Sequence, residues 1–261
     1  MWGAVIGDLT GSAHEFGQIK KISPVMVGEL ITSDSFYTDD TILTIAIYDA
    51  ILNGNCNYDA ALKRYGLEYQ FHKPLNPRFG APPNTFSKGF MDYLNGVGDC
   101  RSYGNGAMMR ISGVGKMFNK LEDVMENAIY ATIPSHNTRG AVECAQTVAQ
   151  TIFYARMGER KQWIRDRLGY VTMEYRPFEK FNRTCYETLN NCMFATFESD
   201  NFEEAIRKVL SFGGDTDTNC AIVGAMAEAL YGVPEFFVRQ ARKKIPQSFA
   251  HILDEAYAYV E

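Results

Sequence analysis

Apolar residues recur at helical spacing along most of this chain. The recurrence predicts helices over residues 2–16, 38–53, 58–70, 86–94, 121–133, 138–156, 161–168, 184–197, 202–211, 221–230, 234–244 and 249–259. Alternating segments with hairpin signals are scarce, and the best strand candidate, 170–173, is short. Apart from two similar acidic helix starts, no internal repeat is evident. The pattern predicts an all-α fold, a single-domain orthogonal multi-helix bundle over residues 1–261.

The two acidic helix starts lie far apart in the sequence. Residues 38–41 read TDDT, and residues 213–218 read GGDTDT. A single Asp at a helix N-terminus is usually a cap, because it meets unpaired N–H groups and a partial positive charge. Four Asp residues brought together repel one another and need a compensating cation. We therefore expect these two helix starts to face each other around a cation site.

Carboxylate and hydroxyl oxygens supply the side-chain donors of this predicted site. Neither segment contains His or Cys, and such hard oxygen ligands suit Mg²⁺, Mn²⁺ or Ca²⁺ far better than zinc. The candidate metal ligands are Thr38, Asp39, Asp40, Asp215, Asp217 and Thr218.

The predicted N-terminal helix is rich in glycine. Each helical glycine costs about 1 kcal/mol relative to alanine, so we expect close packing or a ligand to offset the loss. Asp8 and Glu15 are two helical turns apart and would share one face of this helix. Solubility alone does not explain two acids on an apolar face, although an exposed or capping pair remains the alternative.

Composition and charge narrow the function classes. The 261 residues are 46% hydrophobic and 22% charged, as in an ordinary globular protein. The net charge is −5, and no basic run exceeds Arg242-Lys243-Lys244, so no extended nucleic-acid surface or membrane-surface role is indicated. The sequence has no uninterrupted apolar stretch of about 18 residues, the length that a membrane span needs. The N-terminus lacks a signal-peptide pattern. We expect a cytoplasmic monomer.

The six cysteines form no C-x-x-C pair, so neither a zinc ribbon nor a redox motif is supported. Free buried thiols are the better interpretation.

A glycine-rich segment, residues 102–106 (SYGNG), precedes another helical run. Glycines around an asparagine let bare backbone approach a ligand and point N–H groups at an anion. Gly-Asn-Gly is also a common turn, so this signal is weak alone. His136 stands before the predicted helix at 138, where a histidine is more often a capping or packing residue than a catalyst.

Taken together, these segments resemble the ADP-ribosylglycohydrolase family, which includes dinitrogenase-reductase-activating glycohydrolases and ADP-ribosylarginine and ADP-ribosylserine hydrolases. The resemblance rests on motifs in family order: residues 3–8 with Gly11 and Glu15, 38–41, 102–110, 135–136 and 213–219. Each motif is weak alone, but the set spans essentially the whole chain.

The resemblance implies an all-helical fold with two Mg²⁺ ions, or Mn²⁺, in a central dinuclear metal cleft. It implies that the six candidate ligands hold the metals, with Asp217 bridging them. It implies catalytic roles for Glu15, Asp40 and Asp217, in which an acid near the metals deprotonates or steers a water. The residues implied to bind the diphosphate and ribose of the substrate are Ser102, Tyr103, Gly104, Asn105, Gly106, His136, Gly213 and Gly214.

The implied activity is Mg²⁺-dependent hydrolysis of the bond between ADP-ribose and a modified side chain, which reverses mono-ADP-ribosylation. The cations would bind the ribose diol and fix its C1 against a water, with oxocarbenium character at C1. Arginine is the first choice of acceptor. Serine-, nucleobase- and small-molecule-linked ADP-ribose stay open, because residues 71–101, where family substrate preference tends to reside, match only loosely. The alternatives are an ADP-ribose-binding or crystallin-like structural protein without turnover, and a two-metal phosphohydrolase.

Overall fold

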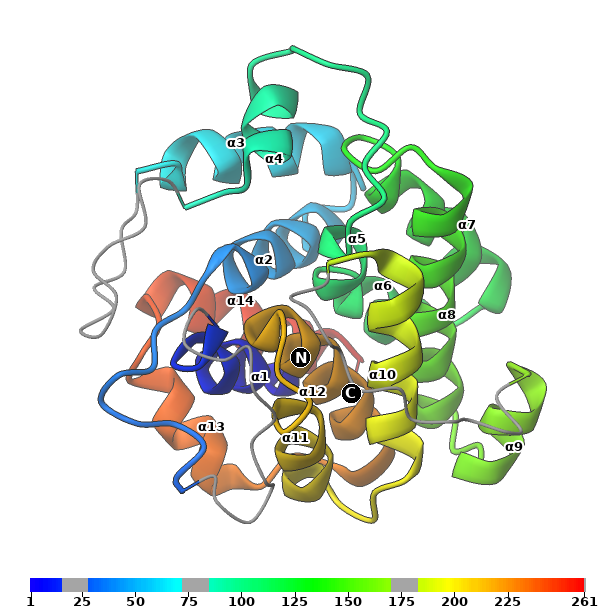
Figure 1. Cartoon of the computed structure of the whole chain (residues 1–261). Helices are drawn as coiled ribbons and strands as arrows, with labels where there is room; N and C mark the ends of the chain where they lie inside the picture. The colour runs from blue at the N-terminus through cyan, green and yellow to red at the C-terminus, as the bar shows by residue number, and fades with distance from the viewer. Residues whose placement is uncertain (16–27, 72–84, 170–182, 261) are drawn as a thin grey trace.

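The computed structural model describes residues 1–15, 28–71, 85–169 and 183–260, and the secondary structure of these residues is mainly helical (Figure 1). The helices are α1 (Trp2–Ser12), α2 (Asp39–Leu52), α3 (Tyr58–Tyr69), α4 (Lys88–Leu94), α5 (Gly106–Met109), α6 (Ser112–Met117), α7 (Leu121–Thr132), α8 (Arg139–Arg156), α9 (Lys161–Arg167), α10 (Cys185–Phe197), α11 (Phe202–Leu210), α12 (Thr216–Tyr231), α13 (Glu235–Arg242) and α14 (Gln247–Val260).

The described residues confirm the all-α prediction. Within these ranges the only strand-like pairings are two isolated β-bridges, one between Arg101 and His136 and one between Gly104 and Thr184. None of the helices described is long and apolar enough to cross a membrane. The strand candidate at 170–173 and most of the region between 71 and 85 lie outside the described residues.

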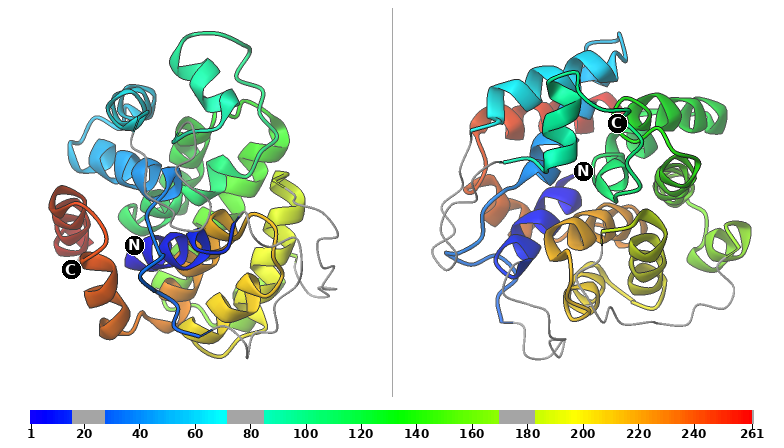
Figure 2. Two further views of the ribbon diagram at one scale, coloured as in Figure 1. Left: turned by 60° about the vertical axis from the view of Figure 1, so that its left-hand side comes forward. Right: turned by 45° about the horizontal axis from the view of Figure 1, so that its top comes forward.

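Helix α1 forms the centre of the bundle, where it packs along α12 (Figures 1 and 2). Gly3, Gly7 and Gly11 are four residues apart and therefore lie on one face of α1. A Cβ atom on Gly7 would lie 1.9 Å from the carbonyl oxygen of Cys220, and one on Gly11 would lie 2.1 Å from that of Thr216. The two helices touch backbone to backbone, so close packing offsets the cost of the glycines.

Helix α1 ends earlier than expected, next to its contact with α12. The Gly11 carbonyl accepts hydrogen bonds from the His14 N–H (2.9 Å) and from the Thr216 hydroxyl (2.8 Å). The bond from His14 is of the 3₁₀ type, which is tighter than an α-helical turn. The bond from Thr216 reaches the same carbonyl from another helix. The predicted continuation to residue 16 is therefore wrong: α1 stops at Ser12, and Glu15 lies beyond it.

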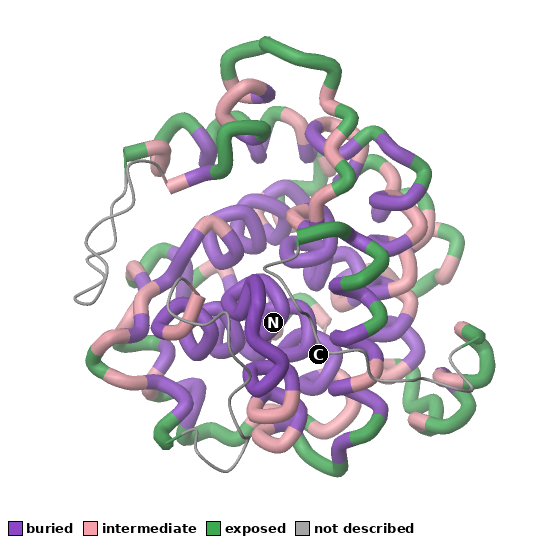
Figure 3. Tube along the Cα trace, viewed as in Figure 1, coloured by how far each residue is buried: buried purple, intermediate pink, exposed green. Residues whose placement is uncertain are grey.

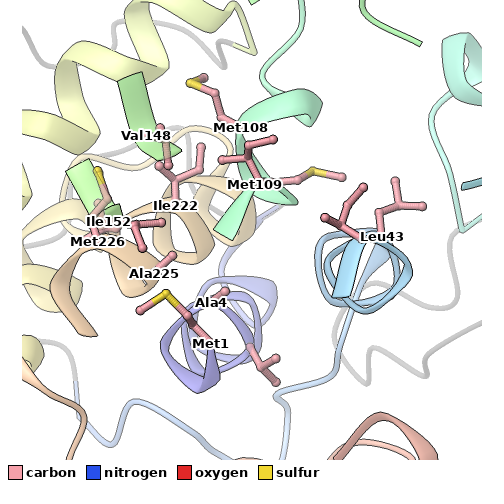
Figure 4. Close-up of a cluster of buried hydrophobic side chains, with 14 of the residues drawn as sticks. Met1, Ala4, Leu43, Met108, Met109, Val148, Ile152, Ile222, Ala225 and Met226 are labelled. Carbon is pink, nitrogen blue, oxygen red and sulfur yellow. The ribbon is translucent and has the colours of Figure 1, made fainter. Parts of the chain in front are cut away.

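Figure 3 shows that the chain around this pair is largely buried. Apolar residues from several helices form the core there. Figure 4 shows Met108 and Met109 of α5 close to Ile222 of α12 and Val148 of α8. All four side chains are at most 5% exposed. The core thus fixes the two ends of α1 and α12 from which the acidic residues project.

All six cysteines are free, as expected. Four are buried, whereas Cys56 and Cys100 are only half-buried, so the prediction of buried thiols was wrong for these two.

Candidate active site

Helix α2 begins against a carboxylate from α1. The Asp8 side chain, fully buried, accepts hydrogen bonds from the backbone N–H groups of Thr38 (2.9 Å) and Thr41 (3.1 Å). It also accepts from the Thr38 hydroxyl (2.8 Å) and the Thr41 hydroxyl (2.5 Å). Two of the unpaired N–H groups at the start of α2 are thereby satisfied from another helix. Asp8 consequently fixes the start of α2 relative to α1.

Helix α12 begins after two glycines that adopt left-handed backbone angles. Gly213 has φ of 73° and Gly214 has φ of 79°, a conformation that other residues adopt only with strain. Asp215 is the N-cap residue of α12, yet its side chain makes no capping bond. Its Oδ2 instead accepts a hydrogen bond from the Asn105 amide at 2.8 Å. The acidic start of α12 is therefore tied to the 102–106 segment.

The two helix starts converge, together with acids from α1 and the turn after it. Carboxylate oxygens of Asp8, Asp40 and Asp217 lie within 4.8 Å of one another, as do those of Glu15, Asp215 and Asp217. We call these the first and the second carboxylate group. Asp217 belongs to both.

Burial and mutual repulsion perturb these acids. Burial raises the pKa of Asp8 to about 6, although bonds from Thr38 and Thr41 partly offset it. Burial, then the charges of Asp215 and Asp39, raise the pKa of Glu15 to about 8. Burial and neighbouring carboxylates raise the pKa of Asp40 and Asp217 well above the usual range. At neutral pH such a cluster needs either protons or a cation.

The donor atoms fit a hard divalent cation. Every side chain in the two groups offers oxygen, and Asp40 Oδ1 is buried without a hydrogen-bond partner among the described residues. A buried carboxylate oxygen left unpaired is costly unless something binds it. The donor chemistry therefore suits a hard divalent cation rather than zinc.

The remaining candidate ligands, two threonines and one aspartate, lie close to the two carboxylate groups. The hydroxyls of Thr38 and Thr218 each lie 3.2 Å from Asp40 Oδ2. Asp39 belongs to neither carboxylate group. It is nevertheless close enough for electrostatic coupling, because burial and then the charges of Asp8 and Asp215 raise its pKa to about 7.

Three hydrogen bonds hold the 102–106 segment in place. Thr138, the N-cap of α8, donates to the Ser102 carbonyl at 3.0 Å. The Tyr103 carbonyl accepts from the Cys185 N–H at 2.9 Å, and the Asn105 N–H donates to the Arg183 carbonyl at 2.9 Å. Asn105 itself is buried, whereas the Tyr103 side chain is 66% exposed.

His136 packs against the two glycines of this segment. A Cβ on Gly106 would lie 3.3 Å from His136 Nε2, and one on Gly104 would lie 3.7 Å from the same atom. The sequence-predicted ligand residues 102–106 and His136 are thus brought together. Gly213 and Gly214 adjoin Asp215, whose contact with Asn105 joins this region to the acids.

Sequence reasoning left Asp8 without a role and overlooked Thr41. It expected Asp8 and Glu15 to share a helix face, which the early end of α1 rules out; both acids nonetheless reach Asp217. The available signal was the pair of threonines three residues apart, whose hydroxyls and N–H groups could meet one external carboxylate. Arg110 and Ser135, which contact each other beside His136, were also given no role.

A sequence profile of the ADP-ribosylglycohydrolase family matches residues 1–259. The chain therefore belongs to the ADP-ribosylglycohydrolase family, and it is a glycosidic-bond hydrolase.

Among particular proteins, the chain is similar to ADP-ribosylhydrolase ARH3 of Homo sapiens, at 22% identity over 89% of this chain and 84% of that protein. It is also similar to ADP-ribosylarginine hydrolase Tri1 of Pseudomonas putida (strain GB-1), at 24% identity over 96% of this chain and 76% of that protein. A solved structure titled ADP-ribosylglycohydrolase-related protein complex has the same fold, with a TM-score of 0.71 and 20% identity over 99% of this chain and 93% of that one.

Proposed function

We propose that this protein hydrolyses the glycosidic bond between ADP-ribose and a modified side chain, with arginine the first acceptor to test, and so reverses mono-ADP-ribosylation. The observation that carries the proposal is the sharing of Asp217 by two oxygen-only carboxylate groups. The names of the relatives support the substrate class, and Tri1 supports arginine. Residues 1–261 act as one domain in this proposal.

Two Mg²⁺ ions, with Mn²⁺ as the alternative, are the proposed cofactors. Thr38, Asp39, Asp40, Asp215, Asp217 and Thr218 are the proposed ligands, with Asp217 common to both ions. When bound, the ions supply Lewis acidity and hold the ribose hydroxyls. Asp8 accepts the Thr38 hydroxyl proton at its Oδ1, and the Asp40 N–H donates to the hydroxyl oxygen, which leaves that oxygen one lone pair for a cation.

Glu15 is the proposed residue that orients the attacking water or takes its proton. It is only half-buried, unlike the aspartates of the two groups, so it can exchange protons with solvent. In the metal-free protein, burial and the charges of Asp215 and Asp39 raise its pKa to about 8, so Glu15 holds a proton more tightly than an ordinary carboxyl does. Asp40 is the other acid in this role.

The 102–106 segment, with His136 and the glycines at 213 and 214, is the proposed ligand-binding part. Small residues and bare backbone there leave room for phosphate oxygens, which N–H groups can bind. The Asn105–Asp215 bond would transmit the position of the diphosphate to the acids, and hence to the ribose carbon that reacts.

The test uses three substrates that carry ADP-ribose on arginine, on serine and on a nucleobase. The purified protein should release free ADP-ribose from at least one of them with Mg²⁺ and from none with EDTA. Tight ADP-ribose and Mg²⁺ binding without turnover would instead identify a non-catalytic binding protein. Release of inorganic phosphate in place of ADP-ribose would identify a phosphohydrolase, and either result would refute the proposal.

A further inference from the structure

Arg110 is a buried cation whose guanidinium is only partly paired. Its side chain is 0% exposed, and one nitrogen, Nη2, donates both to the Ala131 carbonyl (2.9 Å) and to Ser135 Oγ (2.8 Å). The other two nitrogens, Nε and Nη1, have no hydrogen-bond partner among the described residues. Such a group is costly to bury, so its location calls for a role.

The next contact passes from Ser135 to His136. Ser135 Oγ lies 2.9 Å from His136 Nδ1, and both residues are buried. A guanidinium only donates, so Ser135 Oγ must accept from Arg110. The serine then has one proton left, and among the described residues the neighbouring acceptor within reach is Nδ1.

The alternative proton arrangement leaves a group unsatisfied. If Nδ1 carried the proton and donated to Ser135 Oγ, the serine would accept twice and its own buried hydroxyl proton would have no partner. A doubly protonated ring would place a second cation beside Arg110. The arrangement that satisfies every group has Nδ1 bare and the ring proton on Nε2.

We propose that Arg110 and Ser135 are positioning residues that fix His136 as the neutral Nε2–H tautomer, so that Nε2 donates a hydrogen bond to an oxygen of the ligand at residues 102–106. Nε2 is the ring atom that faces Gly104 and Gly106, where the absence of side chains leaves it approachable. The ligand in this inference, the diphosphate or ribose of ADP-ribose, rests on the proposed function.

The electrostatics of the ring agree with this assignment. Burial, and then the charge of Arg110, lower the pKa of His136 to about 3. The imidazole is therefore neutral across the working range of the protein and acts as a directed donor rather than as a cation or a general acid. The wrong tautomer would turn a lone pair toward the oxygen of the ligand and lose the bond.

Long-range ¹H–¹⁵N NMR of histidine-labelled full-length protein reads the tautomer directly. The chain has four histidines, and the signals that disappear in His136→Asn identify the ring in question. The expected pattern is a bare Nδ1 and a protonated Nε2, unchanged between about pH 5 and pH 8. A protonated Nδ1, or titration of the ring in that range, overturns the proposal.

Variants of Ser135 separate positioning from mere packing. Ser135→Ala should give a mixture of tautomers and weaken ADP-ribose binding about tenfold, raising KM with little change in kcat. Ser135→Thr, which keeps the hydroxyl, should restore the Nε2–H pattern. Ser199→Ala is the matched control, because it removes another buried serine hydroxyl, bonded to Ala195; it should alter neither the tautomer nor the affinity.

The outcomes distinguish this inference from the proposed function. If wild-type protein binds ADP-ribose while Ser135→Ala keeps both the tautomer and the affinity, the positioning role of Ser135 is wrong and the proposed function stands. If wild-type protein shows the Nε2–H pattern but binds no ADP-ribose, the proposed function and the assigned ligand fail, and the tautomer assignment stands. Arg110→Met should also give a mixture of tautomers. A folded variant with the wild-type pattern would show that Arg110 does not position His136.

Discussion

The two carboxylate groups that share Asp217 differ in how firmly the fold holds them. The first group takes Asp8 from α1 and Asp40 from α2, and Asp8 alone accepts four hydrogen bonds from Thr38 and Thr41. The second group takes Glu15 from the turn beyond α1. Glu15 is half-buried, and Asp215 accepts a bond from Asn105.

This contrast separates a rigid part of the site from an adjustable part. The positions of Asp8 and Asp217 follow from the backbone contact of α1 with α12, which side-chain motion cannot relax. Glu15 is free of that constraint and lies next to solvent. We infer that the first group pre-organises one part of the cation site, whereas the second group also supplies Glu15, the residue proposed to orient the attacking water or take its proton.

Removing the shared member should have the largest effect. Asp217→Asn should lower kcat by about 10³-fold or more, because it removes a charge from both groups at once. Mg²⁺ should no longer raise the thermal midpoint, while circular dichroism should still report a helical fold. Asp166→Asn, an exposed carboxylate on α9, is the control that keeps activity. Wild-type turnover in Asp217→Asn would show that activity does not need the carboxylate shared by the two groups.

The rigid part can be disturbed without touching an acid. Gly7→Ala places a methyl group 1.9 Å from the Cys220 carbonyl oxygen, so α1 and α12 must separate. We expect a loss of about 3 kcal/mol in the free energy of unfolding, measured by urea denaturation, with a parallel loss of Mg²⁺ binding.

Gly89→Ala is the matched control for that change. Gly89 lies exposed in α4, and a Cβ there meets nothing within 4 Å. Alanine at this position should raise stability by roughly 0.5–1 kcal/mol. Equal effects of the two substitutions would show that the α1–α12 contact does not hold the first group in place.

The sequence was sufficient to predict most of the helices and the meeting of the two acidic helix starts. The start of α2 is an example, since Thr38 caps it through the Asp40 N–H and Asn53 ends it, close to the expected bounds. These are local signals, namely apolar spacing, a capping side chain and a turn, and they do not depend on the rest of the chain.

Contacts between distant segments could not be predicted in the same way. The sequence showed that the N-terminal helix is rich in glycine, but only the structure distinguishes close packing from a ligand. The bond of Asn105 with Asp215 joins residues more than a hundred positions apart, and no periodicity reports such a pair. The bond from the Thr216 hydroxyl of α12 to the Gly11 carbonyl near the end of α1 is another such contact.

The adjustable part is tested by Glu15. Glu15→Ala should lower kcat by about 100-fold, the usual contribution of a positioned acid or base, while Mg²⁺ still stabilises the protein. Glu15→Gln keeps the size of the side chain and should lose a similar factor if proton transfer, rather than packing, is the role. If both variants keep the wild-type kcat, Glu15 takes no part in the reaction.

The smallest effect we expect is a pH dependence of stability that cations reverse. In the metal-free protein the pKa of Asp8 is raised from 3.8 to about 6, and that of Glu15 from 4.5 to about 8. Between these limits the folded state holds protons that the unfolded state has released. Stability must therefore fall as pH rises from about 4 to about 8.

Thermal midpoints in EDTA and in Mg²⁺, taken at intervals across that range, measure this dependence. Because Mg²⁺ takes the place of the bound protons, the difference between the two midpoints should grow with pH, to roughly a few °C for a chain of this size. Asp8→Asn should reduce the slope between about pH 4 and pH 6, and Glu15→Gln should reduce it between about pH 4.5 and pH 8, while Asp39, Asp40 and Asp217 keep the rest. A metal-free protein that becomes more stable toward pH 8 would mean that burial and neighbouring charges do not raise the pKa of these carboxyls, and the pH dependence proposed here would be wrong.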